Sequence, residues 1–281
     1  ITELGNISNI NNITKIDCAD NNLTELDCLE SLISLEELNC TNNKITHLDK
    51  LPPNITKLYC SSNKITHLDN LPAGLIELKC SKNKIEYLDN LPAGLKALYC
   101  VNIGISYHGA FIVGDTPPGS ISKIKQLDNL PISLEILNCG FNEIKQLDNL
   151  PPNLKHLECY SNYLTQLNNL PHSLITLDCN NNDITEIHPI PQTLVKFNCA
   201  DNKITKFEDL PSGLESFNFI NNPIENIDEL ETKPGQMSHN GVTIDYYSEA
   251  EAFRLLDEKG NLIDRKYQKL KTPEEVKDAL S

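Results

Sequence analysis

The sequence predicts a repeat solenoid of the α/β class, mostly β, with a parallel concave sheet, an extended convex side and a small α/β cap at the C-terminal end. Three regularities support this prediction: a cysteine that returns every twenty residues, a fixed frame of apolar positions around it, and an asparagine shortly after it. A unit this short cannot bury its apolar residues alone, so neighbouring units must stack into one core. The regular cysteines are Cys40, Cys60, Cys80, Cys100, Cys139, Cys159, Cys179 and Cys199.

Each cysteine lies at the end of a short alternating segment, such as Leu58, Tyr59 and Cys60. Alternation of apolar and polar residues is the pattern of a strand with one buried face. We expect the strands of successive units to pair in parallel and in register, about 4.8 Å apart. Leucine and cysteine then point into the core, and the residues between them form a common outer face.

An asparagine and a proline predict how the chain turns between strands. The asparagine amide carries donors and an acceptor, so it can bind backbone groups of its own turn and of the next unit. The proline removes an amide donor and favours extended geometry before it. Because only about ten residues separate successive strands, the convex side is predicted to be extended or polyproline-like.

The complete frame is L-P-x-x-L-x-x-L-x-C-x-x-N-x-I-x-x-L-D-N, as residues 71–90 show. It resembles the leucine-rich repeat family, with cysteine at the third apolar position of the L-x-x-L-x-L-x-x-N-x-L core. Its length and its Leu-Pro pair are similar to the short subclass of bacterial secreted effectors, and repeats in large DNA viruses are similar too. The resemblance implies a binding scaffold rather than an enzyme.

The pattern divides the chain into two domains. Residues 1–230 are predicted to form the solenoid, with about ten repeats and a degenerate repeat or an inserted loop near 103–123. After Leu230 the frame ends, and residues 231–281 contain a strand-like segment at 242–247 and a capping box formed by Ser248 and Glu251. A solenoid needs its terminal apolar layer covered, so this second segment is predicted to be a cap.

Composition limits the partners and the compartment. The net charge of −15 argues against nucleic acid, and the chain has no apolar run long enough to cross a membrane, which predicts a soluble protein. Nine of the ten cysteines, including Cys18, hold the inward position, and Cys28 alone is out of register. A linear row with parallel Cβ directions suits neither disulfides nor tetrahedral zinc. We therefore expect reduced, buried thiols, no metal or other cofactor, and a cytoplasmic location.

The frame is interrupted between Cys100 and Cys139, which are nearly two units apart. Ile103 stands where the turn asparagine is expected, and glycines and paired prolines follow it. Long irregular segments on a regular scaffold are often functional, but relaxed constraint on one repeat would leave the same pattern.

Large apolar residues gather on the predicted concave face beside this interruption, where most other repeats expose small or polar groups. Aromatic residues of this kind are frequent hot spots of protein interfaces, although the loop could instead fold back over them. Lys57, Lys79 and Lys82 lie near Tyr59 and would form either a small basic spot or solvated side chains. The candidate partner-binding residues are Tyr59, Tyr99, Val101, Phe111, Ile136, Phe141, His156 and Tyr160.

These observations predict a non-catalytic scaffold that binds a protein partner through the concave face and the 103–123 loop. No phosphate loop, metal-ligand cluster or nucleophile–base arrangement is recognisable in the sequence, and partner and oligomeric state are left open. The resemblance adds a pathogen factor that acts in the host cytoplasm. One alternative is the recognition part of a larger protein whose catalytic domain lies upstream of residue 1. Another is a structural array that associates end to end.

Overall fold

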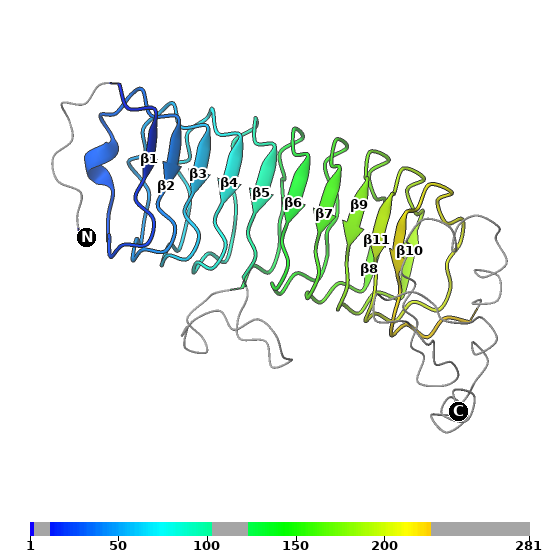
Figure 1. Cartoon of the computed structure of the whole chain (residues 1–281). Helices are drawn as coiled ribbons and strands as arrows, with labels where there is room; N and C mark the ends of the chain where they lie inside the picture. The colour runs from blue at the N-terminus through cyan, green and yellow to red at the C-terminus, as the bar shows by residue number, and fades with distance from the viewer. Residues whose placement is uncertain (3–11, 103–122, 226–281) are drawn as a thin grey trace, which may run out of the picture.

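A computed structural model describes residues 1–2, 12–102 and 123–225. Its main feature is a parallel sheet of ten short strands, stacked side by side along an elongated solenoid (Figure 1). The order in this sheet is β1-β2-β3-β4-β5-β6-β7-β9-β11-β12. The strands are β1 (Lys15–Asp17), β2 (Glu37–Asn39), β3 (Lys57–Tyr59), β4 (Glu77–Lys79), β5 (Ala97–Tyr99), β6 (Ile136–Asn138), β7 (His156–Glu158), β9 (Thr176–Asp178), β11 (Lys196–Asn198) and β12 (Ser216–Asn218).

The strands are in register, as the alternating pattern predicts. The middle residue of one strand is aligned with that of the next, for example Leu58 with Leu78 and Leu78 with Leu98. These middle residues are buried in β2 and in every later strand of the sheet, whereas most of their neighbours are partly or fully exposed. The parallel, one-sided sheet predicted from the repeat frame is therefore confirmed.

The predicted cysteine ladder is present beneath the sheet. The nine cysteines of the inward position are buried, and all ten thiols are free. Cys28 is half-buried and lies outside the ladder, in the short 3-10 helix η1 (Asp27–Leu29). Burial raises the pKa of the ladder thiols, to about 11 at Cys18 and to about 12 at Cys80 and Cys139. At neutral pH these thiols are protonated and act as small apolar side chains.

The asparagine ladder joins neighbouring turns. Asn83 is buried, and its Nδ2 donates to the carbonyls of Cys60, Cys80 and Ser81 at 3.0, 2.9 and 3.3 Å. Its Oδ1 accepts a bond of 3.0 Å from the amide of Ile65 in the preceding turn. The same set recurs at Asn43, Asn63, Asn142, Asn162, Asn182 and Asn202.

The return side of the solenoid is extended, as predicted. Within the described ranges, η1 is the only helical segment. A turn at a proline precedes every strand of the ten-stranded sheet from β3 onwards. In one of these turns the Leu75 amide donates to the Pro72 carbonyl at 3.0 Å. Two return segments also pair in parallel as a small second sheet, β8 (Gln166–Asn168) with β10 (Glu186–His188). No helix in the described part of the chain is long and apolar enough to span a membrane.

The interruption leaves no gap in the sheet. Ala97 of β5 is aligned directly with Ile136 of β6, so these strands are consecutive although residues 103–122 lie between them in sequence. Asn102, which is out of the repeat frame, is buried there and donates from Nδ2 to Oδ1 of Asn142 at 3.0 Å. The Lys123 ammonium donates at 2.6 Å to the carbonyls of both Asn102 and Phe141. The turn that follows β5 is thus joined to the turn that follows β6.

Phenylalanine replaces smaller core residues at the C-terminal end of the sheet. Phe197 and Phe217 occupy the middle positions of β11 and β12, and their rings stack at 5.2 Å. Phe219 occupies the cysteine position and is fully buried. The predicted cap at 231–281 lies outside the described residues.

Candidate functional site

The outward-pointing residues of the ten-stranded sheet form one continuous surface, here called the sheet face. Tyr59, Tyr99, Ile136 and His156 lie on β3, β5, β6 and β7, and Val101, Phe141 and Tyr160 follow the strands β5, β6 and β7. All seven are partly buried. The eighth predicted residue, Phe111, lies outside the described residues. The structure therefore places six of these residues on or directly after the consecutive strands β5, β6 and β7, whereas β4 separates Tyr59 on β3 from them.

Two tyrosines of the sheet face are joined by a lysine between them. The Nζ of Lys79 lies 4.8 Å from the centre of the Tyr59 ring and 5.2 Å from that of Tyr99. Glu77 accepts a bond of 3.3 Å from the Tyr59 hydroxyl and forms an ion pair of 3.2 Å with Lys79. Burial, followed by Glu77, raises the pKa of Tyr59 to about 12. The charge of Lys79, one of the three lysines of the basic spot considered from the sequence, is therefore balanced within this cluster.

A second aromatic cluster follows β6 and β7. The rings of Phe141 and Tyr160 meet edge to face, with centres 5.4 Å apart. Tyr160 lies against the backbone of Gly140, where an added Cβ would come within 2.6 Å of the ring. Phe141 adopts a left-handed backbone with φ of 55°, the conformation that precedes the ladder asparagine in other turns. The missing side chain of Gly140 thus creates the space that the tyrosine ring fills.

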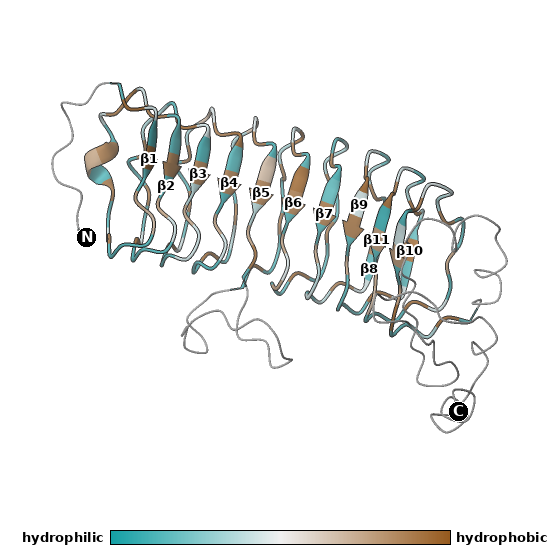
Figure 2. Cartoon of the chain, viewed as in Figure 1, coloured by the Kyte–Doolittle hydropathy of each residue, from teal (hydrophilic) through white to brown (hydrophobic). Residues whose placement is uncertain are grey.

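Ile136 and His156 lie on β6 and β7, the strands that precede Phe141 and Tyr160. They are aligned on β6 and β7, and Ile136 is also aligned with Ala97 on β5. Nδ1 of His156 is 2.9 Å from the hydroxyl of Thr176 on β9. In Figure 2, β5 and β6 are paler or browner than β3, β4 and β7, which are mainly teal. The first residues of β5 and β6 are Ala97 and Ile136, which are less polar than the first residues of β3, β4 and β7, namely Lys57, Glu77 and His156.

Sequence reasoning missed the polar residues around this apolar centre. Glu158 and Asp178 are aligned on β7 and β9. Asn138 donates to Glu158, and Asn180 and Asn198 donate to Asp178 at 2.5 and 3.1 Å. The alternation of inward and outward residues in the sequence places all of these polar residues on the outer surface. Polar residues occupy the outer positions of most repeats, so the pattern alone does not distinguish Glu158 and Asp178 from the others.

We expect Glu158→Gln to raise the melting temperature at pH 7, by about 1–2 °C. Burial, followed by the Asp178 carboxylate, raises the pKa of Glu158, so folding disfavours its ionised form. Stability therefore falls as pH rises from the ordinary carboxyl pKa, about 4.3, through the raised value. The advantage of the glutamine should be full above the raised pKa and should vanish below the ordinary one.

Thermal melts of wild type and Glu158→Gln across that pH window would measure the effect. Glu215→Gln, which removes an exposed carboxylate away from Asp178, is the matched control and should leave the melting temperature unchanged. A Glu158→Gln variant that is less stable than wild type at pH 7 would contradict the expectation.

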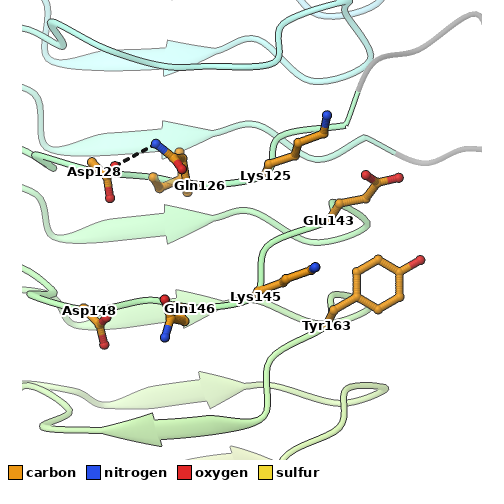
Figure 3. A pocket seen from close by; sticks show the side chains of 9 residues that line it. Lys125, Gln126, Asp128, Glu143, Lys145, Gln146, Asp148 and Tyr163 are labelled. Atoms are coloured by element: carbon orange, nitrogen blue, oxygen red, sulfur yellow. Dashed lines mark hydrogen bonds between the residues drawn. The ribbon is translucent and has the colours of Figure 1, made fainter.

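A hollow of about 750 Å³ lies on the return side, away from the predicted residues (Figure 3). Two successive turns line it with the same side chains, because the hexapeptide Ile-Lys-Gln-Leu-Asp-Asn occurs at both 124–129 and 144–149. The hollow combines both signs of charge without a buried charged group, and nothing in it forms a catalytic arrangement. Its lining is Lys125, Gln126, Leu127, Asp128, Glu143, Lys145, Gln146, Asp148 and Tyr163.

Known proteins share this architecture. The family model described as Leucine Rich Repeat matches residues 34–58. The solved functional domain of InlJ from Listeria monocytogenes, described as including a cysteine ladder, is 31% identical with a TM-score of 0.55, over 75% of this chain and 49% of that one. YopM, a leucine-rich effector protein from Yersinia pestis, is 25% identical with a TM-score of 0.60, over 84% and 66% of the two chains.

A leucine-rich repeat protein of Leptospira interrogans shares the fold, at 21% identity and a TM-score of 0.55, over 85% of this chain and 68% of that one. No curated protein sequence matches significantly. This chain spans about half of the InlJ domain and about two thirds of the YopM chain.

The fold, the ladders and these similarities define a solenoid of short parallel-strand repeats. The chain is a leucine-rich repeat protein, and it resembles bacterial effectors of that family. Such repeats generally serve as scaffolds for binding other proteins along their extended surface.

Proposed function

We propose that this protein is a non-catalytic scaffold that binds a protein partner through the sheet face between β3 and β7, together with the adjoining 103–123 segment. The observation that carries the proposal is the set of aromatic and apolar side chains on β5, β6 and β7, which Lys79 on β4 links to Tyr59 on β3. Two tyrosines hold one lysine, and two further rings meet edge to face. Aromatic side chains that are already ordered lose little entropy on binding, so they make effective anchors.

The chemistry of the thiols agrees with a binding role. The ladder cysteines lie beneath the sheet face, and burial raises their pKa, so they are poor nucleophiles at neutral pH. The surface that remains for a partner consists of rings, amides, carboxylates and short aliphatic groups.

We also propose that the protein acts as a pathogen factor in the host cytoplasm. Ten free thiols suit a reducing compartment. The similarity to a Yersinia effector supports a bacterial factor. The location can be tested by following a tagged full chain after infection with a producing organism and cell fractionation.

The binding function can be tested by affinity capture from cell lysate, with quantification of every captured protein. We expect the Tyr99→Ala/Phe141→Ala/Tyr160→Ala variant to lose a partner that wild type retains, because the hot-spot rings are removed. Each truncation of such a ring commonly weakens binding by about tenfold or more.

The matched control removes exposed apolar side chains elsewhere, as Ile33→Ala/Tyr87→Ala/Ile132→Ala, and should capture the same partner as wild type. Circular dichroism must show that both variants are folded. Equal capture of every protein by wild type and by the sheet-face variant would refute binding through this surface.

A further inference from the structure

The sheet face has an acidic side next to its aromatic centre. Glu158 and Asp178 are aligned on adjacent parallel strands, whose backbones are about 4.8 Å apart. Within the described residues, no lysine, arginine or histidine lies within ion-pair distance of either carboxylate. By contrast, Glu77 on the same face forms an ion pair with Lys79. Among the described residues, His156 on the same strand interacts electrostatically with Glu158, but neither carboxylate takes part in an ion pair.

Amide side chains hold these two carboxylates in place. Within the described residues, they leave one oxygen of each carboxylate without a hydrogen bond. Asn138 donates to Oε2 of Glu158, whereas Asn180 and Asn198 both donate to Oδ1 of Asp178. Inside the described ranges, no hydrogen bond reaches the second oxygen of either group, Oε1 of Glu158 or Oδ2 of Asp178. Neutral amides orient a carboxylate without cancelling its charge. The result is a pair of oriented, negatively charged acceptors on neighbouring strands.

An aromatic surface adjoins this pair. Tyr160 lies two residues after Glu158, just beyond the end of β7, and its ring packs against Gly140. Phe141 supports it from the neighbouring turn, with ring centres 5.4 Å apart. A cation beside carboxylates and over an aromatic face gains from both contacts. A long side chain with an aliphatic stem and a planar charged end fits these two requirements.

We propose that the partner docks a basic segment here, with an arginine guanidinium on Glu158 and Asp178 and its stem against Tyr160. Arginine is favoured over lysine because its five donors lie in one plane and can serve two carboxylates together. The net charge of −15 also attracts basic partners over a longer range. This inference rests on the proposed binding function of the sheet face, and it specifies the chemistry of the partner.

The test uses the full chain and a random peptide library displayed on phage. We expect peptides enriched on wild type to contain an arginine next to an apolar residue. An enriched peptide, made synthetically, should bind Glu158→Gln/Asp178→Asn at least about tenfold more weakly than wild type. Replacing its arginine by lysine should also weaken binding. The matched control Asp128→Asn/Asp148→Asn removes two charges from aligned positions on the return side and should bind as wild type does.

The outcomes separate this inference from the proposed function. Enriched peptides without arginine, or equal affinity for wild type and Glu158→Gln/Asp178→Asn, would overturn the arginine inference. If Tyr99→Ala/Phe141→Ala/Tyr160→Ala still lost binding in that case, the sheet face would remain the binding surface. If neither variant changed the affinity, or if wild type enriched no peptide, both proposals would fail. Circular dichroism of each variant excludes loss of fold as the cause.

Discussion

In reducing buffer, the protein is expected to unfold steeply as the pH rises above about 9. The ladder thiols have an ordinary pKa of about 8.5 in the unfolded chain, and burial raises it to about 11 at Cys18 and higher at the other positions. Between these values the unfolded chain releases protons that the folded chain retains. Stability is therefore full below the ordinary thiol pKa and is lost as pH rises towards the raised one.

The size of this effect follows from the number of thiols. Each loses about 1.4 kcal/mol per pH unit within the window, so nine buried thiols give a slope of about 12 kcal/mol per unit. A typical domain has a stability of about 5–15 kcal/mol, so roughly one pH unit is sufficient to unfold it. Far-ultraviolet circular dichroism during denaturant titrations at increasing pH would measure the slope.

A variant with fewer ladder thiols provides the control. Cys60→Ala/Cys80→Ala/Cys159→Ala removes three of the nine buried thiols and should reduce the slope by about a third. The slope is compared rather than the midpoint, because each alanine also leaves a small cavity. An unchanged slope in this variant would show that other groups, such as tyrosines, cause the alkaline unfolding.

Asn142→Ala is expected to lower the free energy of unfolding by about 3–5 kcal/mol, since each buried polar group left without a partner costs about 1–3 kcal/mol. Its Nδ2 donates to the carbonyls of Cys100, Cys139 and Gly140 at 2.9, 3.0 and 3.1 Å. Its Oδ1 accepts from the Ile124 amide at 3.0 Å and from Asn102 at 3.0 Å. Urea denaturation followed by circular dichroism would measure the loss.

Asn153→Ala is the matched control, because Asn153 is exposed and makes one long bond of 3.4 Å to the Ile132 carbonyl. Its effect should lie within about 0.5 kcal/mol. Equal losses in the two variants would mean that the asparagine ladder does not hold neighbouring turns together. A smaller dependence on urea in Asn142→Ala would indicate that the two halves of the solenoid unfold separately.

Most of the fold was predictable because the same pattern of apolar, cysteine and asparagine positions recurs in each repeat. The residues between Leu58 and Asn63 determine a strand, a buried thiol and a ladder turn, and these features recur in the other repeats. Asn102 was not predicted to complete the ladder, because it lies one residue before the expected position. The pairing of β8 with β10 was not predicted either, since those return segments resemble the unpaired ones in composition.

The placement of the candidate residues on the outer surface was predictable, but their contacts with one another were not. Alternation alone placed Tyr59 and Tyr99 on the outer surface, and the structure agrees. The cluster that Lys79 forms with them depends on the reach of a flexible side chain, which spacing does not specify. The pairing of Glu158 with Asp178 requires the exact register of β7 and β9. That the sheet face binds a partner stays a prediction.

The two identical hexapeptides at 124–129 and 144–149 have an evolutionary consequence. Loss of residues 124–143 would remove β6 yet leave the local sequence after Lys123 unchanged, and duplication of the same segment would add a strand in register. Recombination between such copies can therefore lengthen or shorten the protein by whole units while every ladder bond is re-formed with a new neighbour. The distance between two groups on the sheet face can therefore change by the width of one strand while the fold stays the same. This architecture can acquire new binding specificity by duplication of whole repeats as well as by point substitution.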